Sequence, residues 1–439
     1  MVGLISSFQR GTDYKTYLNK NIPASSYSSD VLDKWMAMQI RLMSTTIASF
    51  NGPFVRIYAY SGLAAYESVS PGISKKSSFL ITASALNKLP TMPEIDPAKN
   101  YYWPTSLNAA MATMNRFMFP TTSPANKSAI DSLENELKTI FSTETDPATI
   151  ERSISFGKNI AQKIFAWAET DGSQQANRPY NPPSGPGKWI PTPPAFAKAV
   201  TPYWGNLRTM VIGSIINTQP PAPPPYSEDT ASEFYKMIKE VYDVDQHLTP
   251  EQKDIILFWR DINPGITAPG HWLNILRQVF QKEKNNIRLD KAAFVYALTG
   301  VALNDAWISC WKTRYEYNLI RPVTYIQNVM GKSEWLPLLS TPPHPEYTSG
   351  FACMAGAVCE SLTAVFGNNY QMTDHTYDSY GMKPRSFDSF LAMAKEAGDS
   401  KFYSGIHYEL SVNVGMKQGI DVAKNIVAFL IQKEKSAKP

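Results

Sequence analysis

The sequence predicts an all-α protein that one long irregular segment interrupts. Apolar residues recur at helical spacing through most of the 439 residues, and the period-two alternation typical of strands is scarce. Prolines cluster between residues 179 and 225, where runs such as Pro220-Pro-Ala-Pro-Pro-Pro225 remove backbone donors and block helix formation. A hydrophobic fraction of 43% over this length is sufficient for one large core or two medium cores.

The N-terminal part contains two helical stretches with recognisable boundaries. Residues 31–69 have a helical pattern that is broken near Asn51-Gly-Pro53, because glycine followed by proline interrupts a helix. Asp146 is a predicted N-cap, since its carboxylate can accept from the free amides of the first turn and Pro147 suits the first helical position. Apolar residues from Ile150 to Trp167 then keep helical spacing.

Five more helices are expected in the C-terminal part. The sequences Thr-Ala-Ser-Glu at 230–233 and Thr-Pro-Glu-Gln at 249–252 match a capping box, in which the first hydroxyl and the fourth side chain satisfy each other's backbone amides. Apolar periodicity predicts a long helix over 290–311, a helix from 348 or 349 to about 366, and a last helix after residue 407 that continues to 433.

The proline-rich segment 179–225 has two interpretations. It could link two helical halves, or it could wrap the surface of one body. We favour wrapping, because linkers seldom carry as many large aromatic residues as Trp189, Tyr203 and Trp204. The prediction is therefore one helical domain over 1–439, with two separate bundles left open.

Composition excludes several classes of protein. The net charge is only +4, without the clustered Lys and Arg of a nucleic-acid-binding surface. No run of about 18 apolar residues predicts a transmembrane span. Residues 1–8 are too short for the apolar region of a signal peptide. The many Ser, Thr, Asn, Tyr and Pro residues are typical of an exported bacterial protein, so we expect a periplasmic or secreted protein whose signal has been removed, with a cytoplasmic location left open.

Cysteine usage does not indicate a disulfide framework. The chain has three cysteines, an odd number. Cys353 and Cys359 are six residues apart in a predicted helix and so lie on different faces. Together with Cys310, they are expected to be buried, unreactive thiols.

Three short motifs near the C-terminus predict one pocket for a tetrahedral oxyanion. Lys312 and Arg321-Pro322 supply an ammonium and a guanidinium separated by a turn, which can approach one anion from two sides. Ser349-Gly350 lies at a predicted helix start, where free amides and the helix dipole favour an anion. Residues 400–407 end in His407, whose neutral imidazole can attack a phosphoryl group or bind a metal-centred oxyanion. Taken singly, each motif also suits solvated charges, an ordinary N-cap or a structural histidine.

The other four histidines make no zinc-type cluster; they are His247, His271, His344 and His375. His271 in Pro269-Gly-His-Trp272 and His344 in Pro342-Pro-His-Pro345 are expected to shape loops, and either can still lie near the pocket.

The joint pattern resembles the superfamily of vanadium-dependent haloperoxidases and type 2 phosphatidic acid phosphatases. That superfamily has the motifs Lys…Arg-Pro, Pro-Ser-Gly-His and Ser-Arg-x-x-x-Gly-x-His. Here they stand as Lys312…Arg321-Pro322, Thr348-Ser349-Gly350-Phe351 and Ser400-Lys401…Gly405-Ile-His407. The gap between Lys312 and Arg321, together with segments such as Pro269-Gly-His-Trp272 and Pro345-Glu-Tyr347, looks like the bacterial haloperoxidase branch. The resemblance covers nearly all of the chain and implies an all-helical fold whose site lies inside a four-helix bundle, carried here by residues 290–433.

The resemblance also implies roles for these residues. His407 would be the metal ligand of a vanadate cofactor, and Lys312, Arg321 and Lys401 would neutralise its oxygens. Ser349 and the Gly350 amide would donate hydrogen bonds to it. In the peroxidases peroxide binds the metal and halide attacks the activated oxygen; in the phosphatases the same pocket holds a phosphoryl group and the histidine is the nucleophile. The implied partners are small molecules, either peroxide and halide or a phosphoester, and a homodimer is compatible with the resemblance.

Three departures from the family pattern concern proton transfer and charge. Phe351 stands where the family has an acid/base histidine, and phenylalanine cannot transfer protons. Loss of such a group typically costs about 10²–10⁴ in rate. Lys401 replaces an arginine, which keeps the charge and loses the planar fork. Ser411 stands where many phosphatases carry an aspartate that orients the imidazole.

These departures leave three functions open. We favour a haloperoxidase-like oxidoreductase with weak or altered activity on an easily oxidised substrate such as iodide. A phosphatase in which another group, for example His344, supplies the proton comes second. A binding protein for phosphate, vanadate or a phosphorylated ligand, without turnover, comes third.

Overall fold

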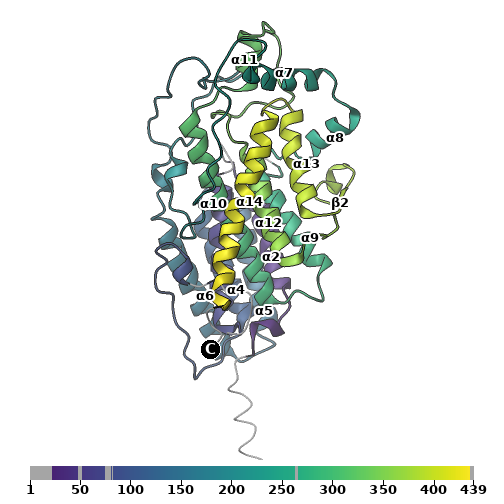
Figure 1. The fold of residues 1–439 in the computed structure, drawn as a ribbon. Helices are drawn as coiled ribbons and strands as arrows, with labels where there is room; N and C mark the ends of the chain where they lie inside the picture. The colour runs from purple at the N-terminus through teal and green to yellow at the C-terminus, as the bar shows by residue number, and fades with distance from the viewer. Residues whose placement is uncertain (1–21, 48–51, 75–80, 82, 263–264, 436–439) are drawn as a thin grey trace, which may run out of the picture.

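The computed structural model describes residues 22–47, 52–74, 81, 83–262 and 265–435, and it confirms the all-α prediction (Figure 1). Strand structure in this part of the chain is confined to β1 (Met372–Asp374) and β2 (Arg385–Phe387), which pair in antiparallel register.

The described N-terminal part of the chain folds into five α-helices. They are α2 (Asp30–Thr45), α3 (Gly52–Val69), α4 (Trp103–Met118), α5 (Pro124–Phe141) and α6 (Pro147–Ala168). The expected interruption of the first helical stretch separates α2 from α3, and its centre at Asn51 lies outside the described residues. Asp146 caps α6 as predicted, accepting a hydrogen bond from the Thr149 amide at 2.9 Å.

The remaining helices carry the pocket. They are α7 (Glu233–Gln246), α8 (Pro250–Phe258), α9 (Ala268–Lys282), α10 (Leu289–Tyr317), α11 (Pro322–Asn328), α12 (Gly350–Phe366), α13 (Phe390–Tyr403) and α14 (Glu409–Lys435). Short 3-10 turns lie at Ala24–Ser26, Ser70–Gly72, Ala83–Ala85, Ser173–Gln175, Trp204–Asn206 and Asp378–Tyr380.

Two predicted helix starts had different outcomes. The capping box at Thr249 is confirmed, with the Thr249 hydroxyl bonded to the Gln252 amide and the Gln252 side chain bonded to the Thr249 amide. The box at Thr230 is wrong, because Ser232 caps α7 by accepting from the Tyr235 amide. Ser232, two positions later, accepts from a backbone amide of the first turn that has no partner within the helix, so the motif located the helix but not its first residue.

Helix α10 is the centre of the fold and packs against α3, α12 and α14 (Figure 1). It is longer than predicted, since it ends at Tyr317 where Asn318 adopts a left-handed conformation. Helices α12 and α14 approach closely because glycines face the partner backbone: a Cβ at Gly419 would lie 2.0 Å from the Cys353 carbonyl oxygen. This contact fixes the N-terminal ends of α12 and α14 beside each other, where the pocket forms.

The proline-rich segment lies against α10 along much of its length. Trp189 and Trp204 are buried. The buried carboxylate of Asp305 on α10 accepts hydrogen bonds from the Met210 and Val211 amides at 2.7 and 3.0 Å. These bonds hold the irregular segment to the helix without requiring regular structure in it.

The three cysteines are buried and free, as predicted. Among the described residues one helix, α10, is long and apolar enough to cross a membrane, but its apolar window is completely buried inside the protein. Burial of this kind is what the central helix of a helical bundle requires.

Candidate active site

A cavity of about 460 Å³ lies where α10, α12, α13 and the loop before α14 meet. Helix α10 contributes Trp307, Trp311 and Arg314, and α12 contributes Gly350 and Phe351 from its first turn. The rest of the wall comes from Phe54 on α3, Met354 on α12, Lys401 on α13, and residues 260–262, 339–344 and 406–407. Segments far apart in the sequence therefore bring a cluster of cations and two imidazoles around one space.

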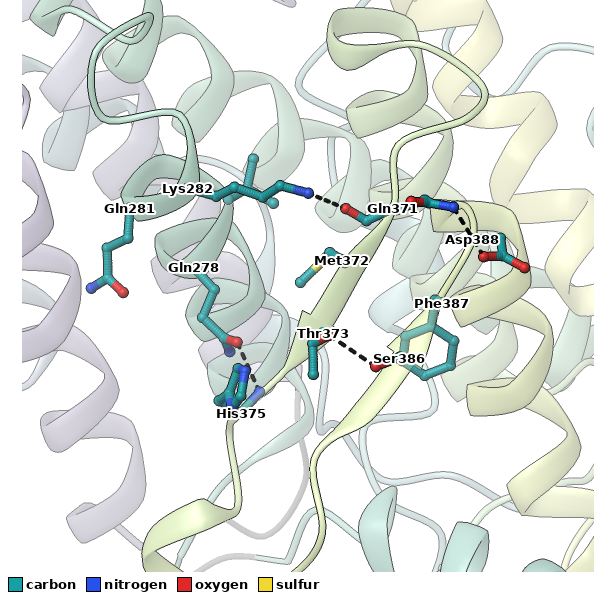
Figure 2. A pocket seen from close by; sticks show the side chains of 11 residues that line it. Gln278, Gln281, Lys282, Gln371, Met372, Thr373, His375, Ser386, Phe387 and Asp388 are labelled. Atoms are coloured by element: carbon teal, nitrogen blue, oxygen red, sulfur yellow. Dashed lines mark hydrogen bonds between the residues drawn. The ribbon is translucent and has the colours of Figure 1, made fainter.

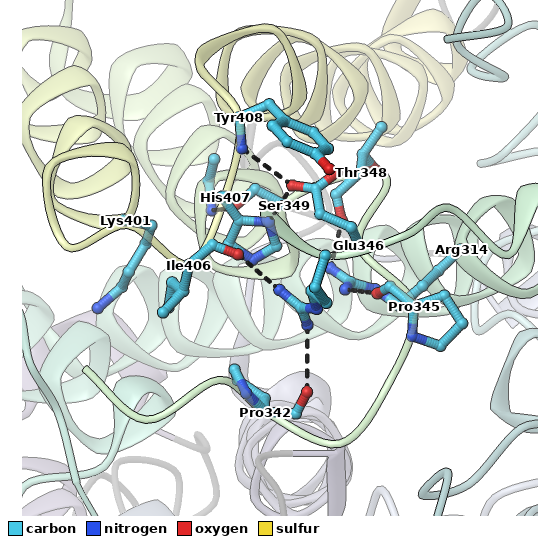
Figure 3. Close-up of polar contacts among 12 residues, drawn as sticks. Arg314, Pro342, Pro345, Glu346, Thr348, Ser349, Lys401, Ile406, His407 and Tyr408 are labelled. Atoms are coloured by element: carbon cyan, nitrogen blue, oxygen red, sulfur yellow. Dashed lines mark hydrogen bonds and ion pairs between the residues drawn. The ribbon is translucent and has the colours of Figure 1, made fainter. Parts of the chain in front are cut away.

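Arg314 provides the cation that α10 directs into this cavity. Its guanidinium is completely buried, bonds to the backbone carbonyls of Pro345 and Thr348, and lies over the Trp311 ring at 5.2 Å (Figure 3). Its Nε is buried without a hydrogen-bond partner among the described residues. The two carbonyl bonds fix the guanidinium plane and leave Nε as the donor without a protein partner.

The structure corrects the prediction for Lys312, which does not line the cavity. Its side chain is exposed, and its backbone packs against the turn at Gly205, where a Cβ would lie 2.5 Å from the Lys312 Cα. Because α10 continues to Tyr317, positions 312 and 314 point about 200° apart around the helix. Arg314 lies on the same face as Trp307 and Trp311, seven and three residues earlier, and a buried stripe of this spacing was the sequence feature that could have identified it.

Arg321, the N-cap residue of α11, is completely buried behind the cavity wall. It donates to the backbone carbonyls of His344 and Ile406 at 2.9 and 2.8 Å. Burial lowers the pKa of Arg321 to about 9, with the positive charge of Arg314 adding to the decrease. Two buried guanidiniums this close to each other make the region strongly electropositive.

His344 lies between the two arginines rather than merely shaping a loop. Its Nδ1 is 2.8 Å from Arg314 Nη1 and 2.8 Å from Arg321 Nη2, and its ring packs on Trp311 at 4.9 Å. Arginine side chains are always donors, so Nδ1 is the acceptor and the ring is neutral. Burial and both arginines hold the pKa of His344 well below its usual value. It is therefore a poor source of the proton that a phosphatase leaving group needs.

His407 lies in the loop between α13 and α14 and lines the cavity. Its Nδ1 is 2.6 Å from Glu346 Oε1, which also accepts from the Tyr408 amide at 3.1 Å (Figure 3). The carboxylate fixes the ring so that Nε2 is the nitrogen left for a ligand. Burial raises the pKa of Glu346 to about 7, although Arg321 and Arg314 oppose the increase.

Glu346 also alters the interpretation of Ser411. The sequence comparison with the family suggested that the imidazole lacks a carboxylate partner because Ser411 replaces an aspartate. The structure supplies that partner from Glu346, 61 positions before His407 in the chain. No spacing pattern links the two residues, so only the tertiary structure could reveal the pair.

Ser349 and Gly350 form the start of α12. The Ser349 hydroxyl caps the helix by accepting a hydrogen bond from the Ala352 amide at 3.4 Å. Ser349 is buried, but it is not one of the residues that line the cavity. Gly350 does line it, and a Cβ there would lie 3.0 Å from the Trp307 ring and 3.5 Å from Arg314 Nη2. Glycine is thus needed for the α12 backbone to approach the same space as Arg314.

Lys401 and Phe351 occupy adjacent positions on the cavity wall. The Lys401 ammonium lies 3.8 Å from the centre of the Phe351 ring and donates to the Trp259 carbonyl. Burial lowers the pKa of Lys401 to about 8, while Asp261 partly offsets that decrease. A cation–π contact therefore holds the lysine where the family arginine would stand, and it uses the aromatic ring that replaces the family histidine.

A larger groove, of about 640 Å³, lies at the surface beside β1, β2 and α9 (Figure 2). Its polar groups largely bond to one another: Thr373 to Ser386 at 2.8 Å, and the His375 amide to Gln278 at 2.8 Å. Lys282 bonds to the Gln371 carbonyl. Of the described residues that line the groove, Lys282 is the one lysine or arginine, so the groove offers less positive charge to an oxyanion than the buried cavity does.

Comparison with known proteins identifies the chain. A family described as the VCPO second helical-bundle domain matches residues 294–434. The crystal structure of the first bacterial vanadium-dependent iodoperoxidase is 34% identical, covers 93% of this chain and 96% of its own, and superposes with a TM-score of 0.81. The chain belongs to the vanadium haloperoxidase family.

More distant haloperoxidases agree with this assignment. The structure of a holo-type bacterial vanadium-dependent chloroperoxidase is 16% identical and has a TM-score of 0.65 over 98% of this chain and 99% of its own, which shows the shared fold. The vanadium chloroperoxidase of Curvularia inaequalis is 31% identical over 117 residues. That match covers 22% of this chain and 19% of the Curvularia protein, so it spans about a fifth of the fungal enzyme's length.

The side chains of this haloperoxidase relative are suited to an oxyanion such as vanadate. Two residues that line the cavity each carry a buried donor without a partner among the described residues, Nε of Arg314 and Nε1 of Trp307. Buried donors are rarely left unpaired, so a ligand that offers acceptor oxygens would satisfy both. Arg314, Lys401 and the more deeply placed Arg321 would balance its charge, and His407 Nε2 is free to be its nitrogen ligand.

Proposed function

We propose that this protein binds vanadate in the cavity and oxidises iodide with hydrogen peroxide. The observation that carries the proposal is the convergence of Arg314, Lys401 and the His407–Glu346 pair on one buried space that contains unpaired donors. The 34% identical relative is a vanadium-dependent iodoperoxidase, which supports iodide as the halide. When bound, vanadate supplies a Lewis-acidic centre that activates peroxide toward attack by the halide.

The residues of this chain would act by holding charge and geometry. Glu346 keeps the proton of His407 on Nδ1, so that Nε2 presents its lone pair to the cavity. Arg314 donates from Nε to an oxygen of the bound anion, and its charge stabilises the negative charge that accumulates there. Lys401 adds a second positive charge on the opposite wall. Phe351 transfers no proton, which is why we expect a turnover below that of relatives with an imidazole at this position.

A test should separate binding from turnover. Calorimetric titration of vanadate, and of phosphate in parallel, into wild type and His407→Ala should show a loss of at least tenfold in vanadate affinity in the variant. Iodide and bromide oxidation with peroxide are then measured after vanadate loading. Equal vanadate affinity in the two proteins would refute the assignment of the pocket, and vanadate binding without iodide oxidation would leave only the binding function.

One observation keeps a phosphatase as the second candidate. A histidine that attacks a phosphoryl group needs a carboxylate on its other nitrogen, and Glu346 occupies that position. Hydrolysis of p-nitrophenyl phosphate by the vanadate-free protein, lost in both His407→Ala and Glu346→Gln, would support this activity. The suppressed basicity of His344 argues that such hydrolysis is slow, because no imidazole is available to protonate the leaving group.

A further inference from the structure

Among the described residues that line the cavity with the cations, one is a carboxylate, Asp261. Asp261 lies in the connection between α8 and α9, and its side chain is 1% exposed. None of the three motifs includes it. A buried carboxylate in an electropositive cavity that would hold an anion requires an explanation, because it opposes the charge of the ligand.

The two oxygens of Asp261 have different surroundings. Oδ1 takes a hydrogen bond from the Tyr377 hydroxyl at 2.6 Å and lies 2.9 Å from His271 Nδ1. Oδ2 is buried and has no hydrogen-bond partner in the described part of the chain. Oδ1 is therefore occupied by protein donors, and Oδ2 is the oxygen of this cavity-lining residue that has no partner.

His271 behind Asp261 is a fixed cation rather than a proton carrier. Its Nε2 lies 2.7 Å from the buried carboxylate of Asp374. Burial alone would lower the pKa of His271, but Asp261 and Asp374 outweigh burial and raise it to about 10. Both ring nitrogens are therefore protonated at neutral pH, and His271 donates to Oδ1 permanently. The ring holds Asp261 in place and partly neutralises it.

His407 Nε2 is assigned to the bound anion by the proposed function, and the remaining groups on the cavity wall are poorer proton acceptors than Asp261. Phe351 has no exchangeable proton, and the acceptor nitrogen of His344 is occupied by two arginines. Arg314 and Lys401 are donors, and Lys401 is already committed to a carbonyl and the Phe351 ring. Among the described residues that line the cavity, Asp261 Oδ2 is the remaining unoccupied carboxylate oxygen.

We propose that Asp261 is the proton acceptor of this site and performs, from a different wall, the task of the imidazole that Phe351 replaces. The inference rests on the proposed function. The O–H bond of hydrogen peroxide breaks as an O–H bond to Oδ2 forms, so one proton moves and no electrons leave the peroxide. Iodide then attacks the deprotonated peroxide: an I–O bond forms as the O–O bond breaks, and iodide is oxidised by two electrons to hypoiodite. The other peroxide oxygen leaves as hydroxide and takes the proton back from Oδ2 to form water. His271 and Tyr377 stay bonded to Oδ1 throughout.

The decisive variant is Asp261→Asn, because the hydrogen bonds from His271 and Tyr377 determine the orientation of the asparagine side-chain amide. His271 and Tyr377 both donate toward the Oδ1 position, so the amide oxygen must occupy it and the NH₂ group must replace Oδ2. The cavity loses an acceptor and a negative charge and gains a donor. Asp261 has a φ of 45°, a left-handed conformation that asparagine tolerates and alanine does not, so Asn is also the appropriate residue for the backbone.

We expect opposite effects on binding and turnover. Affinity for phosphate and for vanadate, measured by calorimetry at pH 8, should stay equal or rise, up to about tenfold, because a like charge is removed. The kcat for iodide oxidation should fall by about 10²-fold or more. Asp374→Asn is the matched control: it removes a buried carboxylate from the other nitrogen of His271, outside the cavity, and it is assayed at a temperature at which thermal unfolding shows it to be folded. It should give no rise in affinity and a loss of kcat below tenfold.

A second measurement uses Phe351→His. If Asp261 performs the role of the missing imidazole, the loss caused by Asp261→Asn should shrink at least tenfold in the Phe351→His background, because the new imidazole accepts the proton. Should Asp261→Asn not fold, Asp261→Glu keeps the charge and displaces the oxygen by one methylene, and a fall in kcat with retained affinity is again expected.

The outcomes are distinguishable. Suppose that wild type binds vanadate and oxidises iodide. An Asp261→Asn variant that is unaffected, or that loses affinity and kcat together, would then overturn the role of Asp261 and leave the proposed function intact. A wild type that neither binds vanadate nor oxidises iodide would overturn both.

Discussion

The choice between Arg314 and Lys312 gives the sharpest test of the site. Arg314→Lys keeps the positive charge on α10 and removes the fork. The structure leaves Nε as the uncommitted donor of Arg314, so the variant loses one charge-assisted hydrogen bond to a bound oxyanion. Such a bond contributes about 1.5–3 kcal/mol. At about 1.4 kcal/mol per factor of ten, vanadate affinity should fall by roughly 10- to 150-fold.

Lys312→Met is the matched control, since Lys312 is an exposed cation two residues away on the opposite face of α10. Solvent screens its charge, so vanadate affinity should change by less than about twofold. Calorimetric titration with vanadate measures both variants, and thermal unfolding without ligand checks that each is folded. A tenfold loss in Lys312→Met, with Arg314→Lys unchanged, would contradict the placement of the α10 cation and restore the original sequence interpretation.

Three further predictions concern the walls of the cavity. Glu346→Gln should weaken vanadate binding by about 10–100-fold, because the amide orients His407 without raising its basicity. In wild type, the folded-state pKa of Glu346 is raised to about 7, so the unfolding midpoint should fall as pH rises from about 4.5 to 7 and Glu346 loses its proton. Glu346→Gln has no such proton, so this part of the pH dependence should be absent in the variant. Gly350→Ala should lower vanadate affinity at little cost in expression, because its Cβ would displace Trp307; unchanged affinity would show that α12 can move away. Asp374→Asn should destabilise the protein by about 3–5 kcal/mol at pH 6. The stability that protonated His271 contributes is fully present below pH 6.5 and is lost as pH rises through about 10. The difference in unfolding free energy between wild type and Asp374→Asn, measured with urea, should therefore shrink toward pH 10.

The fold was predictable because its main evidence is local. Helical periodicity, the caps at Asp146 and Thr249, and the start of α12 at Ser349 each depend on residues within one or two turns. The end of α10 was the local feature that failed. The sequence after Trp311 contains no glycine or proline until Pro322, and α10 continues through Lys312 and Arg314 before Asn318 ends it.

The site was only partly predictable because its partners are distant in sequence. Motifs located Gly350, Lys401 and His407 on the cavity wall, and Arg321 just behind it. The carboxylates Glu346 and Asp261 depend on contacts between segments, and no spacing rule leads to either. The resemblance drew attention to replacements at motif positions, whereas the groups that take over orientation and, we propose, proton transfer come from outside those motifs.

The electrostatics of the cavity explain why an anion should stabilise this protein. Arg314 and Arg321 are both completely buried and share one neutral acceptor, His344 Nδ1. The lowered pKa of Arg321 expresses the cost of placing two like charges together away from water. A bound oxyanion offsets that cost with opposite charge, so its binding free energy adds to the free energy of unfolding, by about 2.7 kcal/mol at a hundredfold excess over the dissociation constant. Phosphate and vanadate should therefore both raise the unfolding temperature of wild type, and the increase should be much smaller in Arg314→Lys.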